Sequence, residues 1–208
     1  DIANTWKSVI CIGTGNEGSS GGHFSANVEE TEMIELAIAE RETTTNVQFW
    51  KSYEDLFDII LTAPDNQEYE IGEFERPSRR EIIFDQTKIL IYVGVPAPYS
   101  TKQEIFFAFL PLNDYINSGI WSFRLKKRKI VDGFFQMYLP PAVQRNAGTR
   151  FFRQNPELTM TIPATSAKAI SVAAYNDSVD AYADFSGRGR QGGFSYLAAE
   201  GNKPDLAA

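Results

Sequence analysis

Hydrophobic and polar residues alternate with a period of two from about residue 32 to residue 139. In the first stretch Ile34, Leu36 and Ile38 alternate with Glu35 and Ala37. Alternation of this kind predicts β-strands that have one buried and one solvent-facing side. The same pattern predicts further strands at residues 47–50, 57–61, 69–74, 81–84, 88–95, 105–110, 120–125 and 131–138.

Turn signals separate these segments, among them the sequences APDN at 63–66, RPS at 76–78, PAP at 96–98 and NSG at 117–119. Short strands that are rich in aromatic residues and separated by such turns are typical of two antiparallel sheets packed face to face. The sequence therefore predicts a mainly β protein that is built around an antiparallel β-sandwich of the jelly-roll type.

The two flanks of the chain have a different composition, which is richer in Gly, Ala and Ser. Their apolar runs, residues 9–12 and 169–174, do not alternate, and the second consists mostly of small residues. Runs of this kind are typical of strands that are buried on both faces of a parallel sheet. We therefore expect residues 1–27 and 158–208 to form parts of one α/β domain, with the sandwich of residues 28–157 inserted between them.

Composition narrows the range of partners. The 208 residues carry a formal net charge of -7, which argues against a nucleic-acid backbone as partner. The basic cluster at 126–129 lies between two strand patterns and is interpreted as a solvated hairpin turn.

The single cysteine, Cys11, lies in an apolar run, where we expect it to be a small buried hydrophobic residue. No segment is long and apolar enough to span a bilayer.

The sequence GTGNEG at residues 13–18 matches the glycine pattern of a dinucleotide-binding loop, and an acidic residue, Glu40, follows at a suitable distance. In that motif the third glycine opens a helix whose N-terminus faces the phosphates. Here Gly21 and Gly22 follow within four residues of Gly18, and glycine disfavours helix. The nucleotide interpretation fails on this context, and we predict neither a cofactor nor a metal ion.

Four segments instead resemble, in order, those of the subtilisin-like serine proteases (subtilases, peptidase S8 type). They are TGNEG at 14–18, TIPA at 161–164 with KAISVAAYN at 168–176, ADFSGRG at 183–189, and KPDLAA at 203–208. A sandwich between the first two segments resembles in particular the clostridial subtilases of spore germination. The resemblance implies a peptide or protein substrate, an extracellular or spore-associated location, and an internal fragment of a longer endopeptidase. Residues 194–202 lengthen the connection before Lys203 relative to the family.

By this resemblance Asn16 is the side-chain donor of the oxyanion hole. The implied substrate-binding residues are Gly15, Glu17, Thr161, Ile162, Pro163 and Ala164. The family's Asp and His precede the asparagine segment and its nucleophilic Ser follows the last segment, so this chain would lack the triad. The one histidine, His23, is expected to be structural, and Ser186 lacks the context of the nucleophile.

Three alternatives remain open at this point. Asn16 could cap a turn or adopt a left-handed conformation, as asparagine often does. The parent protein could be a pseudoprotease with a decayed triad. The sandwich could be a carbohydrate- or protein-binding module that uses Trp50, Trp121 and Tyr138, although their alternating placement favours core packing. Unpaired sheet edges in the flanks could also promote self-association.

Overall fold

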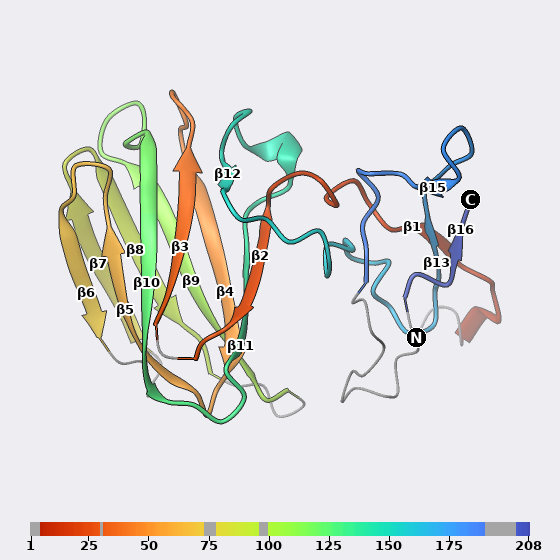
Figure 1. The fold of residues 1–208 in the computed structure, drawn as a ribbon, viewed down its shortest axis with the longest axis horizontal. Coiled ribbons are helices and arrows are strands. Elements are labelled where there is room, and N and C mark those ends of the chain that lie inside the picture. The colour runs from red at the N-terminus through yellow and green to blue at the C-terminus, as the bar shows by residue number, and fades with distance from the viewer. Residues whose placement is uncertain (1–4, 30, 73–77, 96–99, 190–202) are drawn as a thin grey trace. The chain divides into compact units, whose positions relative to one another are not determined.

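The computed structural model of the chain describes residues 5–29, 31–72, 78–95, 100–189 and 203–208. Contacts divide the chain into two compact units. The smaller unit combines Asp1–Gly21 with Asn155–Ala208, and the larger unit is Gly22–Gln154. Nearly all the regular structure is β-strand, which confirms the prediction of a mainly β protein (Figure 1).

The larger unit contains two antiparallel sheets. One sheet has the strand order β12-β3-β10-β5-β6, formed by β3 (Thr31–Ile38), β5 (Leu56–Thr62), β6 (Glu68–Gly72), β10 (Gly119–Lys129) and β12 (Arg150–Phe151). The other has the order β2-β11-β4-β9-β8-β7, formed by β2 (His23–Asn27), β4 (Thr45–Ser52), β7 (Ser78–Phe84), β8 (Thr87–Val93), β9 (Lys102–Pro111) and β11 (Phe134–Tyr138). A short 3-10 helix, Ala142–Gln144, follows β11.

The alternating hydrophobic residues of the two sheets face each other and form one core. Phe107 of β9 meets Phe123 of β10 with ring centroids 5.2 Å apart, in an edge-to-face arrangement. Trp121 of β10 is fully buried and packs in the same way against Phe109 of β9, at 5.2 Å. Each fully buried side chain of this size stabilises the fold by roughly 1.5–3 kcal/mol. The antiparallel sandwich expected from the period-two pattern is therefore confirmed.

Along the chain, the strands pass repeatedly from one sheet to the other. Strands β3 and β10 are neighbours in one sheet, and β4 and β9 are neighbours in the other, as in a jelly roll. Strands β5 and β6 form a simple hairpin, as do β7 and β8. The chain thus crosses between the sheets several times, which joins them into one unit.

One local expectation was wrong, and two strands were not predicted. The basic residues 126–129 do not form a turn but continue β10, and their exposed side chains fit a strand that faces water. Ser25–Asn27, for which the hydrophobic pattern predicts no strand, belong to β2 and pair with β11. The two-residue strand β12 had no signal in the hydrophobic pattern.

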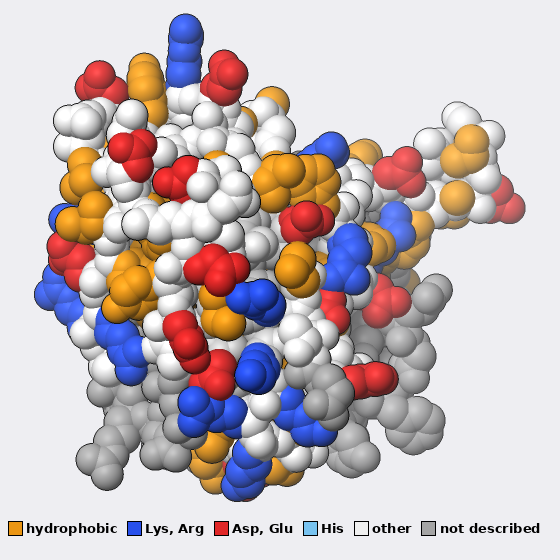
Figure 2. Space-filling model, turned by 60° about the vertical axis from the view of Figure 1, so that its left-hand side comes forward, with side chains coloured by type: hydrophobic (Ala, Val, Ile, Leu, Met, Phe, Trp, Pro, Cys, Tyr) orange, Lys and Arg blue, Asp and Glu red, His pale blue; other side chains and the backbone are white. Residues whose placement is uncertain are grey.

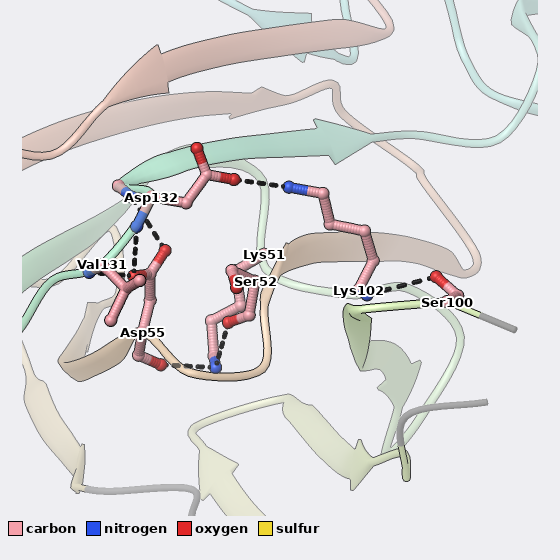
Figure 3. A network of polar contacts seen from close by, with 8 residues as sticks. Lys51, Ser52, Asp55, Ser100, Lys102, Val131 and Asp132 are labelled. Carbon is pink, nitrogen blue, oxygen red and sulfur yellow. Dashed lines mark hydrogen bonds and ion pairs between the residues drawn. The ribbon is translucent and has the colours of Figure 1, made fainter. Parts of the chain in front are cut away.

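The turn after β10 is held by the carboxylate of Asp55, which is fully buried (Figure 3). Oδ1 accepts the backbone N–H groups of Val131 at 2.7 Å and Asp132 at 3.0 Å, and Oδ2 accepts that of Gly133 at 2.9 Å. This anchor explains why the turn comes at 130–133 rather than at the basic residues before it.

Lys51 lies beneath the same turn and is almost completely buried. Its ammonium group donates to the backbone carbonyls of Ser52 at 3.1 Å and Asp55 at 2.6 Å. Burial lowers the pKa of Lys51 to about 8, and the nearby Asp55 carboxylate partly offsets this shift. The exposed end of the network is the ion pair between Lys102 and Asp132, at 2.8 Å (Figure 3).

Basic and acidic side chains lie among one another on the face of the molecule that Figure 2 shows. Two cations of β10 are paired with acidic residues, Arg128 with Asp58 at 2.6 Å and Arg124 with Glu68 at 3.1 Å. Acidic residues of the neighbouring strands β5 and β6 therefore partly neutralise the basic residues of β10. Within the described ranges, no helix has the length and hydrophobicity of a membrane span.

The smaller unit is organised around a parallel sheet of β1 (Cys11–Gly13), β13 (Ile170–Ala173) and β16 (Leu206–Ala207), in the order β1-β13-β16. A short antiparallel pair, β14 (Tyr175–Asn176) and β15 (Ala181–Tyr182), follows β13. Cys11 is exposed, so the expectation that it is a buried hydrophobic residue was wrong. The wider α/β domain, and the boundaries expected at 27/28 and 157/158, stay predictions.

Candidate active site

The segment at residues 14–18 begins where two parallel strands end. Cys11–Gly13 pair in register with Ile170–Val172. The N–H of Thr14 then continues the ladder by donating to the carbonyl of Val172 at 3.0 Å. Residues that follow the carboxyl ends of parallel strands are the usual location of ligand and active sites in such sheets.

Backbone hydrogen bonds bring two further predicted segments against residues 14–18. The N–H of Thr161 donates to the carbonyl of Thr14 at 3.0 Å. From the other segment, Gly187 N–H donates to the carbonyl of Gly15 at 2.9 Å, and the N–H of Gly18 donates to the carbonyl of Phe185 at 2.9 Å. Segments separated by more than 140 residues in sequence are thus joined by main-chain contacts.

Two glycines of this loop are required by the packing. Gly15 has φ +89°, and a Cβ at this position would lie 2.4 Å from Oγ1 of Thr161. A Cβ on Gly18 would lie 2.2 Å from the carbonyl oxygen of Ser186, which is part of the backbone and cannot easily move. The glycine spacing that resembles a nucleotide-binding motif therefore serves close contact between chain segments.

A buried hydroxyl pair fixes the start of the loop. Oγ of Ser186 lies 3.0 Å from Oγ1 of Thr14 and accepts the N–H of Ala174 at 3.0 Å. Ser186 is fully buried. Its oxygen is therefore engaged in holding β13 and the 14–18 loop together, in agreement with the expectation that Ser186 is not a nucleophile.

The side chain of Asn16 is exposed and forms no hydrogen bond with any residue that the structure describes. Its backbone is not in the left-handed region. The arrangement thus offers neither of the turn-based roles considered for this asparagine. A primary amide in this position leaves two N–H donors available to a ligand.

The remaining predicted site residues differ in exposure. Glu17 and Thr161 are half-buried, while Pro163 is exposed and Ile162 is 88% exposed. Ala164 is fully buried, and its N–H donates to the carbonyl of Thr161 at 2.9 Å. The segment 161–164 therefore starts against the 14–18 loop and presents its middle residues to solvent.

The fourth predicted segment closes the sheet on its other side. One carboxylate oxygen of Asp205 accepts the N–H of Ser171 at 2.7 Å and its hydroxyl at 2.9 Å. Lys203 lies 2.5 Å from the same oxygen. These contacts, led by the hydrogen bond from Lys203, lower the pKa of Asp205 to about 2. The sequence analysis assigned no role to Asp205. Asp205 lies between the pair Lys203-Pro204 and the apolar pair Leu206-Ala207, and this position is a sequence signal for a residue that anchors the start of a strand.

The structure also places residues that were candidates for other roles. His23 lies on β2 in the larger unit, is almost completely buried and stacks on Tyr138 with ring centroids 4.5 Å apart. Among the described ranges no group of three His, Cys, Asp or Glu side chains is arranged to hold a metal ion. The lengthened connection expected at 194–202 lies outside the described residues.

Comparison with solved structures identifies a similar protein. The chain is similar to a clostridial protease. It matches the CspB protease of Clostridium perfringens with a TM-score of 0.86 and 30% sequence identity over 97% of this chain. The match covers 41% of the length of that protease. No protein-family model matches the chain, and no match was found among curated proteins. A relation to this protease is thus supported by both fold and sequence identity.

Proposed function

We propose that this chain is an internal part of a subtilisin-like serine endopeptidase and that it carries the oxyanion hole and one wall of the substrate pocket. The observation that carries the proposal is the convergence of the predicted segments on the carboxyl ends of β1 and β13, with the amide of Asn16 left free. The similarity to the CspB protease supports the same class of enzyme.

The proposed chemistry of Asn16 follows from charge development during acyl transfer. Attack on a peptide carbonyl places negative charge on its oxygen, and a preorganised N–H donor stabilises that charge. An asparagine donates without a titratable proton. The backbone bonds of Thr14, Gly15 and Gly18 fix the loop on both sides of Asn16, so little reorganisation of the loop is needed when the oxyanion forms.

The proposed substrate contacts lie on either side of this donor. Gly15 and Glu17 flank Asn16, and residues 161–163 leave the loop toward solvent as the pocket wall. Ala164 is fully buried and anchors the end of this wall in the smaller unit. A peptide bound along this wall would have its scissile carbonyl within reach of Asn16.

The covalent steps require groups that this chain does not supply. Activation of a serine nucleophile needs a histidine within hydrogen-bonding distance, and the one histidine, His23, is buried in the other unit and stacked on Tyr138. We therefore propose that the Asp, His and Ser of the triad lie elsewhere in a longer protein. Below, the full-length protein means that longer polypeptide.

The test is covalent labelling with a fluorophosphonate, which reacts with an activated serine. We expect the full-length protein to be labelled and to cleave a peptide substrate, and the isolated 208-residue chain to do neither. Heat-denatured full-length protein is the control for non-specific reaction. A folded full-length protein that is neither labelled nor active would contradict the endopeptidase proposal and identify a pseudoprotease.

A further inference from the structure

The outer face of the six-stranded sheet carries aromatic rings that the core does not use. On β4 the residues Val47 and Phe49 point into the core, so the alternate residues Gln48 and Trp50 point outward. The interpretation of Trp50 and Tyr138 as core residues was wrong, because both lie on this outer face and are half-buried. Only Trp121 of the three candidates lies in the core.

The register brings the outward residues of neighbouring strands together. Gln48 lies opposite Phe106 of β9, and Phe106 lies opposite Tyr92 of β8. The rings of Phe106 and Tyr92 are 6.4 Å apart, and Tyr92 is 40% exposed. Trp50 is the diagonal neighbour of Phe106 on the adjacent strand. The face therefore carries one ring pair in contact, Phe106 with Tyr92, and the separate indole ring of Trp50.

Polar groups without partners stand between these rings. Glu104 lies opposite Trp50, and on its other side the strand continues as Gly94, which has no side chain to cover it. The side chains of Glu104 and Gln48 and the indole N–H of Trp50 form no hydrogen bond or ion pair with any residue of the described ranges. Burial raises the pKa of Glu104.

We propose that this face, defined by Gln48, Trp50, Tyr92, Glu104 and Phe106, is a binding site for a neutral pyranoside glycan. The faces of a pyranose ring present C–H groups that pack on aromatic rings, and its hydroxyls donate to and accept from amides and carboxyls. The combination of the half-buried rings of Trp50 and Phe106, the exposed ring of Tyr92 and unpaired amide, carboxyl and indole groups fits both halves of such a ligand.

The same residues fit other partners less well. The cores of protein–protein interfaces are depleted of carboxylates, because an unpaired buried charge is costly. Here an unpaired glutamate stands opposite Trp50 and two residues from Phe106 on the same strand. Arg79 lies over the Tyr92 ring at 5.7 Å, but the Glu104 carboxylate and the net charge of -7 disfavour a polyanionic ligand. The proposal does not depend on the protease function, since every residue it uses lies in the larger unit.

Isothermal titration calorimetry of the 208-residue chain with cellohexaose and with N-acetylchitohexaose tests this site. We expect saturable binding of at least one of these β-linked probes. Trp50→Ala and Gln48→Ala should each weaken that binding by about tenfold or more, whereas Trp50→Phe, which keeps a ring, should weaken it less. Ile120→Ala is the matched control, because Ile120 is 51% exposed on the other sheet, and it should leave affinity unchanged.

Thermal unfolding of each variant shows whether it is folded. Gln48→Ala removes no aromatic ring, so this variant tests the site if Trp50→Ala proves unstable. Absence of binding to both probes at millimolar concentration would overturn the proposal. Equal weakening by Ile120→Ala and Trp50→Ala would also overturn it. Concentration-dependent dimerisation that Trp50→Ala abolishes would overturn it too, by assigning the face to a second copy of the chain.

Discussion

Replacing Asn16 by alanine in the full-length protein is expected to lower kcat by about 10²–10³-fold while KM stays nearly constant. The physical reason is that an oxyanion donor contributes more in the transition state than in the bound substrate. The corresponding loss, about 3–4 kcal/mol, is that measured when one such donor is removed from a subtilase. Because Asn16 is exposed and has no hydrogen-bond partner among the described residues, the unfolding temperature should not change. Steady-state kinetics and thermal unfolding measure both quantities.

Ser19→Ala is the matched control for this variant. Ser19 lies in the same loop, is exposed, and forms no side-chain hydrogen bond with the described residues. We expect its kcat and stability to equal those of the unmodified protein. A folded Asn16→Ala protein that keeps most of its kcat would remove the oxyanion assignment. A loss of about 1 kcal/mol of stability with normal kcat would indicate a capping role instead.

Replacing Asp55 by alanine should destabilise the larger unit by about 3–5 kcal/mol, a large part of the stability of an ordinary domain. The substitution removes the acceptor of three backbone N–H groups, those of Val131, Asp132 and Gly133. It also takes away the carboxylate that partly compensates the buried ammonium of Lys51. Urea unfolding followed by circular dichroism measures the change as a lower midpoint.

Asp132→Ala provides the comparison within the same network. Asp132 is also an aspartate, but its pair with Lys102 is at the surface, with 46% of the aspartate side chain exposed. Such pairs contribute about 0–1 kcal/mol. If Asp55→Ala and Asp132→Ala shift the urea midpoint equally, the carboxylate of Asp55 is not the anchor of the turn.

The sequence predicts the sandwich well because its signal is local. Strands such as Thr45–Ser52 and Lys102–Pro111 bury every second residue, and that alternation is visible without any knowledge of their partners. The end of β10 was not predictable in this way. Residues 126–129 look like a turn by composition, whereas the actual turn is positioned by Asp55, which is more than 70 residues distant.

Prediction of the candidate site depended on a different kind of signal. The order of the four segments indicated the family resemblance, but the contacts between them are non-local. Nothing near Gly18 in sequence shows that Ser186 leaves no room for a side chain there, and nothing near Ser171 shows that Asp205 binds it. The role of Cys11 was mispredicted for the same reason, because an apolar run does not reveal which face of its sheet is covered.

The most direct test of the central claim is the crystal structure of the full-length protein with a peptide boronate, whose tetrahedral adduct mimics the oxyanion. The account predicts a boronate oxygen at about 2.7–3.1 Å from Nδ2 of Asn16, with the peptide lying along residues 161–163. A boronate oxygen that is bound by other donors, with the Asn16 amide turned away from it, would contradict the account.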